Sequence, residues 1–367
     1  TNRERQRTMD ILNYLQGMAV QHGPSGHEAE VSGWLKARFE ALCDSVTIDP
    51  LYNVIALKKA TAPTKDGSPA PRVMLAAHQD EIALMVADIL PDGSLRMGQV
   101  GGVDPRILPA STVTVHATGA GNGTEKLLGV VGSPPPHLLS TADREHNYKR
   151  EDLFVDLGLP VDKVRAQVRI GDLITLHGPA TPLLNDRCAA KTMDDRACVA
   201  CLLEAAERLQ KMSHICDIYF VATSQEEVGS KGASVAAHAI DPDLAVALDV
   251  THATIPQSRP DTTVPLDAPA ATYGPFVQYK LLERLKKAAK DHGIKLNTEH
   301  AERFTCTDLD NIQIAREGVP CVLIDLPLKY MHTTVELLDM NVIRECGRLL
   351  AHFLGDLDEG WNEALWS

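Results

Sequence analysis

Two adjacent glutamates, Glu226 and Glu227, follow an apolar run at residues 218–222 that predicts a buried strand. Successive side chains on an extended segment diverge, so one glutamate can hold a metal while the other handles a proton. A Glu-Glu pair in a loop is more often a solvated turn, and its meaning therefore depends on what else converges there.

Three other apolar runs also end in residues that can do chemistry. They are residues 73–77 before His78, residues 244–248 before Asp249, and residues 319–324, which lead through a short loop to His332. Continuous short runs of this kind are typical of strands buried on both faces of a largely parallel sheet. Sites in open sheets form beyond the carboxyl ends of the strands, so the pattern predicts one site assembled from distant segments.

A further carboxylate, Asp194, introduces a long apolar helix expected over about residues 197–210. An aspartate before a helix commonly caps free N–H groups, and by itself it carries no functional information. Asp194 gains meaning when it is counted with the other candidates, because together they supply two imidazoles and three carboxylates, with Glu226 in addition. These ligand candidates for two divalent ions are His78, Asp194, Glu227, Asp249 and His332.

The charges of such a site balance, since two dications carry +4, three carboxylates −3 and a bridging hydroxide −1. A neutral cluster can lie in a cleft without a large desolvation penalty. In two-metal hydrolytic sites the ions lie roughly 3.5–4 Å apart and lower the pKa of a shared water to about 7. Glu226 would then accept the proton of that water and return it to the leaving amine. Mixed histidine and carboxylate ligands favour Zn²⁺, and Co²⁺ or Mn²⁺ can occupy the same kind of site.

Bulk properties narrow the class of protein. At 367 residues the chain predicts two domains or one large domain with an insertion. A formal net charge of −13 argues against nucleic acid and anionic membranes as partners. We expect a cytoplasmic protein, because no apolar stretch reaches membrane-spanning length and no signal-peptide core is present. The eight cysteines lie mostly in apolar segments and are expected to be reduced core thiols.

The domain organisation follows from a change of texture along the chain. Between residues 83 and 178 the sequence predicts short strands broken by Gly and Pro, which is typical of a small β-rich domain. We therefore expect a catalytic domain from residues 1–82 and 179–367, with residues 83–178 inserted in it. Near its start, Ser25 and Glu28 have the Ser-x-x-Glu spacing of a capping box that would open a helix.

Five short motifs together resemble the tetrahedral (TET) aminopeptidase family of co-catalytic metallopeptidases. That family includes glutamyl and deblocking aminopeptidases and some members once labelled endoglucanases. The resemblance spans nearly the whole chain, and the five motifs in this order are far more specific than any one alone. They are His78-Gln79-Asp80-Glu81, Met193-Asp194-Asp195-Arg196, Gln225-Glu226-Glu227-Val228-Gly229, Ala247-Leu248-Asp249 and Tyr330-Met331-His332-Thr333-Thr334-Val335-Glu336.

The resemblance implies an α/β three-layer metallopeptidase domain with a central, mostly parallel sheet. It implies that the insertion makes dimers, that dimers build twelve-subunit tetrahedral shells, and that the substrates are peptides with a free N-terminus. Asp80 would orient His78 by accepting its second ring N–H. The other implied roles are His78 and Asp249 on one metal, Glu227 and His332 on the other, Asp194 bridging them, and Glu226 as general base.

Three other functions remain to be compared. A metal-dependent deacylase or carboxypeptidase of the same clan would use similar ligands, but such enzymes carry their extra domain after the Asp249-like ligand, whereas the insertion here precedes Asp194. A glycosidase needs two carboxylates facing each other across roughly 5–9.5 Å, which adjacent residues cannot do. A non-catalytic metal-binding protein would be expected to have lost Glu226. An aminopeptidase accounts for every motif.

Overall fold

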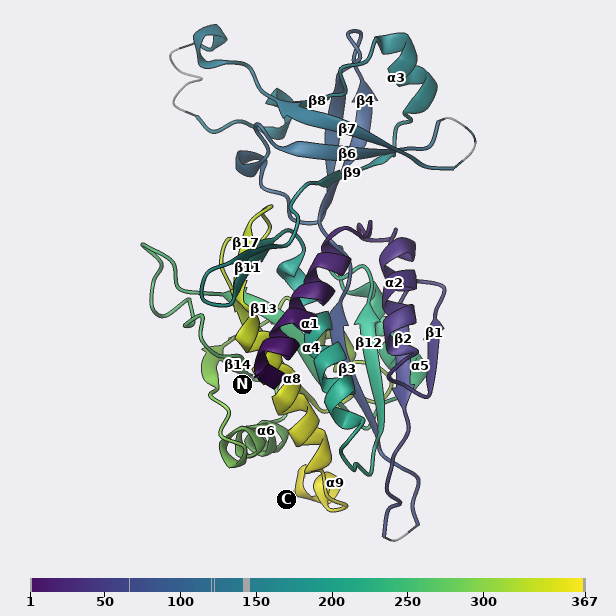
Figure 1. Cartoon of the computed structure of the whole chain (residues 1–367), viewed down its shortest axis with the longest axis vertical. Helices are drawn as coiled ribbons and strands as arrows, with labels where there is room; N and C mark the ends of the chain where they lie inside the picture. The colour runs from purple at the N-terminus through teal and green to yellow at the C-terminus, as the bar shows by residue number, and fades with distance from the viewer. Residues whose placement is uncertain (1, 66, 120, 122, 141–145, 366–367) are drawn as a thin grey trace. The chain divides into compact units, whose positions relative to one another are not determined.

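The chain folds into two compact units, which the computed structural model describes for residues 2–65, 67–119, 121, 123–140 and 146–365 (Figure 1). The first unit contains Thr1–Asp80, Pro179–Met331 and Val335–Ser367. The second contains Glu81–Gly178 together with His332–Thr334. The chain therefore leaves the first unit twice, once for about a hundred residues and once for three.

An eight-stranded mixed sheet forms the centre of the first unit. Its four middle strands, β12, β3, β13 and β16, are parallel, so their carboxyl ends meet at one edge of the sheet. Antiparallel pairing joins β2 to β12 on one side and β14 to β16 on the other. In sheet order the strands are β1 Ser45–Ile48, β2 Val54–Lys58, β12 Asp217–Thr223, β3 Arg72–His78, β13 Leu244–His252, β16 Cys321–Leu328, β14 Ala270–Tyr273 and β15 Asn297–His300.

The middle strands are buried on both faces, as their continuous apolar runs predict. In β3, Val73 and Leu75 join one hydrophobic cluster, whereas Met74 and Ala76 join another. Alternate side chains of a strand point to opposite faces, so each cluster covers one face of the sheet.

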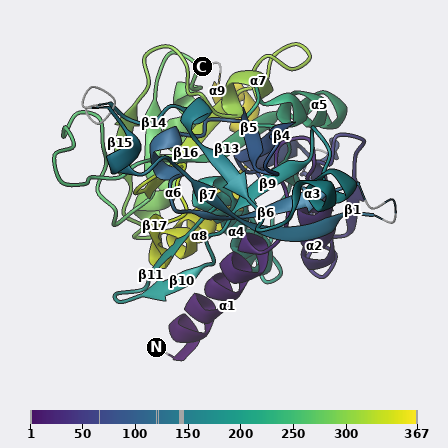
Figure 2. The same ribbon diagram turned by 90° about the horizontal axis from the view of Figure 1, so that it is seen from above.

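Helices pack on both of these faces. On one, α1 (Asn2–Ala19), α4 (Met193–Leu209) and α8 (Met340–Gly355) lie side by side (Figure 1). On the other, α5 (Lys231–Ile240) and α7 (Leu309–Ile312) contact the strands, and Figure 2 places them on the side away from α1. The remaining helices of the unit are α2 Ala29–Phe39, α6 Tyr279–Asp291 and α9 Trp361–Leu365.

A small antiparallel sheet also belongs to the first unit and supports the start of α4. It pairs β10 (Thr181–Leu183), β11 (Arg187–Ala190) and β17 (Glu336–Asp339). Within the described part of the chain, no helix combines the length and apolar character needed to cross a membrane.

The second unit is a closed antiparallel barrel with its own hydrophobic core. The short strands that the sequence predicts in this region are present, and closure removes the exposed edges that such strands would otherwise leave. The α-helix α3 (Val161–Gln167) accompanies the barrel. In barrel order the strands are β4 Ala83–Ile89, β5 Leu95–Val100, β8 Phe154–Asp156, β7 Glu125–Gly132, β6 Thr112–Ala117 and β9 Leu173–Leu176.

Candidate active site

His78 is the last residue of β3 and is only 2% exposed. Its Nε2 lies 3.0 Å from Asp194 Oδ1, and its Nδ1 lies 3.3 Å from Asp80 Oδ1. His78, Asp194 and Asp249 each offer one ligand atom, and these three atoms lie within 4.8 Å of one another. The structure thus brings together residues that are 55 to 171 positions apart in the chain, at the strand edge expected from the sequence.

Asp194 and Asp195 interrupt the first turn of α4. Both have non-helical backbone angles, so the regular turns of α4 begin after Asp195, close to the start that the sequence predicts. The Asp194 N–H donates to Glu336 Oε2 at 3.2 Å, and the His78 N–H donates to Asp195 Oδ2 at 3.1 Å. This turn is therefore attached both to β17 and to the end of β3.

Asp80 connects three separate segments. Its Oδ1 accepts the Glu226 N–H at 3.0 Å, and its Oδ2 accepts the Ser25 hydroxyl at 2.6 Å and the Glu227 N–H at 3.3 Å. Burial alone would raise the pKa of Asp80, but His78 and these donors hold that pKa below its usual value. The carboxylate that faces His78 is therefore ionised and fixed in orientation.

The capping box expected at Ser25 and Glu28 is wrong. The helix α2 begins at Ala29, and the side chain of Glu28 makes no capping hydrogen bond. Ser25 donates instead to Asp80, while Glu28 Oε1 accepts the N–H groups of Gly26 at 2.7 Å and Gln225 at 3.0 Å. Burial and the nearby Asp80 raise the pKa of Glu28 to about 7. The two residues have the spacing of a capping box, but their side chains bind Asp80 and the backbone next to Glu226 instead of capping a helix.

The two glutamates lie in the turn between β12 and α5. Gln225 and Gly229 have positive φ angles of 56° and 110°, and the Glu226 carbonyl accepts the Gly229 N–H at 2.8 Å. Glu226 Oε2 lies 4.0 Å from His78 Nε2, and Glu226 Oε1 accepts the Ser230 hydroxyl at 3.3 Å. The Glu226 carboxylate therefore faces the cluster of His78, Asp194 and Asp249, which we call the His78 group.

The electrostatics of this group are dominated by crowded, buried carboxylates. Burial raises the pKa of Glu226 to about 8, and Asp308 and Glu227 add to the shift while His78 opposes it. Burial, followed by Asp195, raises the pKa of Asp249 well above its usual range. Burial alone would lower the pKa of His78, but Asp194 and Asp80 more than reverse this. Such a cluster needs added positive charge if its acids are to be ionised together.

Two further residues, which the sequence did not predict to belong to the site, lie near this group. Asp308 precedes α7, is 1% exposed and accepts the Thr223 hydroxyl, and its pKa is raised by burial to about 6. Cys198 donates its thiol to the Asp249 carbonyl at 3.1 Å. The Thr307-Asp308 dipeptide lacks a preceding apolar strand, so the strand-end rule could not find it.

His332 is placed differently from the other predicted residues. Met331 and Val335 belong to the first unit, but His332, Thr333 and Thr334 belong to the second. His332 has a positive φ of 60°, and its Nδ1 lies 2.9 Å from the Gly102 carbonyl oxygen.

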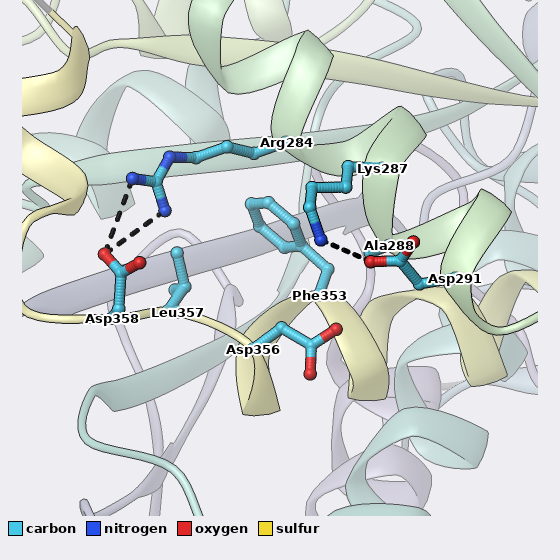
Figure 3. Close-up of a pocket in the computed structure, with 8 residues that line it drawn as sticks. All are labelled: Arg284, Lys287, Ala288, Asp291, Phe353, Asp356, Leu357 and Asp358. Atoms are coloured by element: carbon cyan, nitrogen blue, oxygen red, sulfur yellow. Dashed lines mark hydrogen bonds and ion pairs between the residues drawn. The ribbon is translucent and has the colours of Figure 1, made fainter.

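A pocket of about 350 Å³ lies elsewhere on the first unit, where α6 meets the end of α8 (Figure 3). Two ion pairs at its walls, Arg284 with Asp358 and Lys287 with Asp291, satisfy charges within the pocket. Its lining contains none of the predicted catalytic or ligand residues. It is lined by Arg284, Lys287, Ala288, Asp291, Phe353, Asp356, Leu357 and Asp358.

Comparison with known proteins identifies the family. Residues 59–349 match the family described as M42 glutamyl aminopeptidase, which is well over half of the chain. The chain belongs to this family. The resemblance inferred from the five motifs is therefore confirmed, and the protein is a hydrolase of peptide bonds with aminopeptidase relatives.

Individual relatives agree with this assignment. The lysyl aminopeptidase of Pyrococcus furiosus is 37% identical over 322 residues, covering 86% of this chain and 88% of the relative. The crystal structure of a TET aminopeptidase from a marine-sediment Thaumarchaeota archaeon has a TM-score of 0.89 at 29% identity and covers 99% of both chains. The Pyrococcus horikoshii TET1 peptidase, described as assembling into a tetrahedron or a large octahedral shell, has a TM-score of 0.79 at 25% identity. That comparison covers 95% of this chain and 100% of the relative.

The donor set of this M42 enzyme fits a divalent ion. His78, Asp194 and Asp249 are all buried, with exposed fractions of 2, 7 and 6%. They come from β3, the start of α4 and β13, three elements fixed to one another by the sheet and the core. Imidazole nitrogen and carboxylate oxygens are ligands that Zn²⁺ and other first-row dications accept.

Proposed function

We propose that this M42 enzyme is a metal-dependent aminopeptidase that removes N-terminal residues from peptides with two divalent ions. The observation that carries the proposal is the buried group of His78, Asp194 and Asp249, whose ligand atoms lie within 4.8 Å of one another. In this proposal His78 and Asp249 would hold one ion, Glu227 and His332 would hold the other, and Asp194 would be a ligand common to both.

Two divalent ions held there would supply Lewis acidity and would lower the pKa of a bound water. The protein's own residues do the rest of the work. Asp80 Oδ1 lies 3.3 Å from His78 Nδ1, where it would accept the ring N–H and so leave Nε2 as the ligand atom. Glu226, whose Oε2 lies 4.0 Å from His78 Nε2, would accept the proton of the attacking water and deliver it to the leaving amine. Added positive charge lowers the pKa of Glu226 from about 8 toward the range that a general base needs near neutral pH.

The nature of the metal and of the substrate belongs to the same proposal. The ligand set favours Zn²⁺, with Co²⁺ or Mn²⁺ as alternatives. The runner-up function is a deacylase or carboxypeptidase of the same clan, which would not require a free amine. The relatives include a lysyl and a glutamyl aminopeptidase, so the side chain preferred at the N-terminus must be measured.

Chelation and an acetylated substrate test the proposal together. Activity on a panel of aminoacyl fluorogenic substrates should vanish after exhaustive chelation and return with Zn²⁺, Co²⁺ or Mn²⁺. A free-amine dipeptide should be cleaved, and its N-acetylated counterpart should not. Full activity at a metal content near zero would contradict the two-ion mechanism, and preference for the acetylated dipeptide would favour the deacylase.

Assembly is a second part of the proposal. The second unit, which contains the insertion expected at residues 83–178, would make dimers, and the dimers would build a twelve-subunit shell. Each subunit of the shell would contain one catalytic domain of three-layer architecture. The Pyrococcus horikoshii relative supports this, because it assembles into closed shells. The eight free cysteines suit a reducing compartment, and we propose the cytoplasm. Sedimentation of the full chain as a monomer at working concentrations would contradict the shell.

A further inference from the structure

Gly102 lies against His332 within the second unit. It follows β5 and precedes the short helix η1 (Pro105–Ile107). Its carbonyl oxygen lies 2.9 Å from His332 Nδ1. The contact joins a residue of the barrel unit to the one predicted ligand that the same unit contains.

The close approach explains why a glycine stands at this position. A Cβ atom at residue 102 would lie 3.0 Å from His332 Nδ1 and 3.1 Å from its Cε1, tighter than ordinary van der Waals contact. Gly98, four residues earlier in β5, has no such restriction, since a Cβ there would meet Met85 atoms at 3.8 Å. A side chain at residue 102 would therefore push the imidazole of His332, whereas one at residue 98 would not.

The contact also selects the tautomer of His332. A backbone carbonyl can only accept a hydrogen bond, so Nδ1 must carry the hydrogen. In a neutral imidazole the other nitrogen, Nε2, then carries the lone pair that a metal needs. Metal-bound histidines are commonly oriented in this way by a carbonyl or carboxylate on their second nitrogen.

We propose that Gly102 is a positioning residue for the metal centre, whose carbonyl fixes the ring and tautomer of His332 so that Nε2 is the ligand atom. The inference rests on the proposed function, in which His332 is a ligand. It adds that a backbone carbonyl of the insertion acts on the proposed ligand His332, besides the role of the insertion in assembly. No substrate contact is assigned to Gly102.

The test compares Gly102→Ala with the matched control Gly98→Ala in the full-length enzyme. Metal content after equilibrium dialysis, the affinity for each ion, and the absorption spectrum of the Co²⁺-loaded protein are measured, with thermal unfolding to confirm that both variants fold. Gly102→Ala should weaken one of the two ions by about 10- to 100-fold and change the Co²⁺ spectrum, as loss of an orienting partner does. Gly98→Ala should bind both ions as the parent does.

His332→Ala separates failure of this inference from failure of the proposed function. If His332→Ala keeps both ions at full affinity, His332 is not a ligand and the proposed ligand set is wrong. If His332→Ala loses one ion but Gly102→Ala binds both normally, the ligand set stands and the role of Gly102 is overturned. Equal losses in Gly102→Ala and Gly98→Ala would also overturn it. Adding Gly102→Ala to His332→Ala should cause no further loss, because the two residues act on one ion.

Discussion

The two histidines of the proposed ligand set are held in different ways. His78 ends a central strand, is 2% exposed, and has Asp80 at one ring nitrogen and Asp194 at the other. His332 is half-buried in a loop of positive φ and has a backbone carbonyl, that of Gly102, at its Nδ1. One is fixed by sheet register and charged partners, the other by a turn and a neutral acceptor.

This difference indicates which part of the proposed metal centre the fold itself holds in place. The strand register β3–β13 and the packing of α4 against both strands fix His78 and Asp249 whether or not an ion is bound. Charge-assisted hydrogen bonds such as those around Asp80 are roughly twice as strong as neutral ones. We therefore expect the ion that His78 and Asp249 would hold (the His78 ion) to be bound more tightly. The ion that Glu227 and His332 would hold (the His332 ion) should exchange more readily.

The largest effect on activity should come from substituting the two glutamates. Glu226 lies near His78, whereas Glu227 is proposed to hold the same ion as His332. Glu226→Gln keeps the shape of the side chain but removes the proton acceptor near His78. Both ions should remain bound while kcat falls by roughly 10²–10⁴. Glu227→Gln withdraws a charged oxygen from the ion that Glu227 and His332 are proposed to hold, so that ion alone should be lost and added metal should partly restore activity.

Metal stoichiometry and kcat measured on both variants decide the matter. Loss of an ion in Glu226→Gln with both retained in Glu227→Gln would mean that the two roles are reversed. If neither variant lowers kcat, the catalytic site does not lie on this turn.

The next effect is the pH dependence of ion binding at His78. Without ions, burial raises the pKa of Glu226 to about 8, and Asp194 and Asp80 hold the pKa of His78 well above its usual value, so both groups hold a proton near neutral pH. A raised folded-state pKa contributes stability below the unfolded value, and this stability is lost as pH rises through the folded value. The metal-free enzyme should therefore lose stability as pH rises from 6 to 8.

The affinity for ions should change with pH in the opposite direction, because a bound ion displaces these protons. Affinity at the His78 group should rise by about tenfold per pH unit for each proton released, since ligands must be deprotonated to bind. Calorimetric titrations in buffers of different ionisation enthalpy count the protons. Binding of the tighter ion without proton release would contradict this account of the His78 group.

The sequence predicted the strand-end half of the site better than the loop half. The apolar runs before His78, Glu226 and Asp249 form strands whose carboxyl ends meet, because period and burial are local properties of a sequence. The barrel topology of the second unit, by contrast, depends on which short strands pair, and nothing local specifies that.

Loop contacts could not be predicted for a related reason. Ser25 and Glu28 matched a local capping pattern, yet their partners are Asp80 and Gln225, which lie far away in the chain. A spacing rule tests only neighbours in sequence, so it chose the local explanation. The contact between Gly102 and His332 spans 230 positions and involves a backbone carbonyl, which carries no sequence signal.

The smallest effect should come from Ser25→Ala, which tests whether the His78 half really is the better supported one. The Ser25 hydroxyl donates to Asp80 Oδ2 at 2.6 Å, and both residues are buried. Losing a hydrogen bond to a charged group costs about 1.5–3 kcal/mol of stability. Asp80 still accepts hydrogen bonds from the N–H groups of Glu226 and Glu227 in this variant, so it should still orient His78, only less firmly.

We expect Ser25→Ala to lower the affinity for the His78 ion by less than tenfold and to leave the His332 ion unchanged, with Ser25→Thr restoring the hydroxyl and the affinity. Ser94→Ala is the matched control, because its hydroxyl donates at 3.2 Å to the exposed Asp92. Separate affinities for the two ions and the urea midpoint of each variant are the measurements. A larger loss at the His332 ion than at the His78 ion would reverse the comparison, since Ser25 would then support the half that it does not touch.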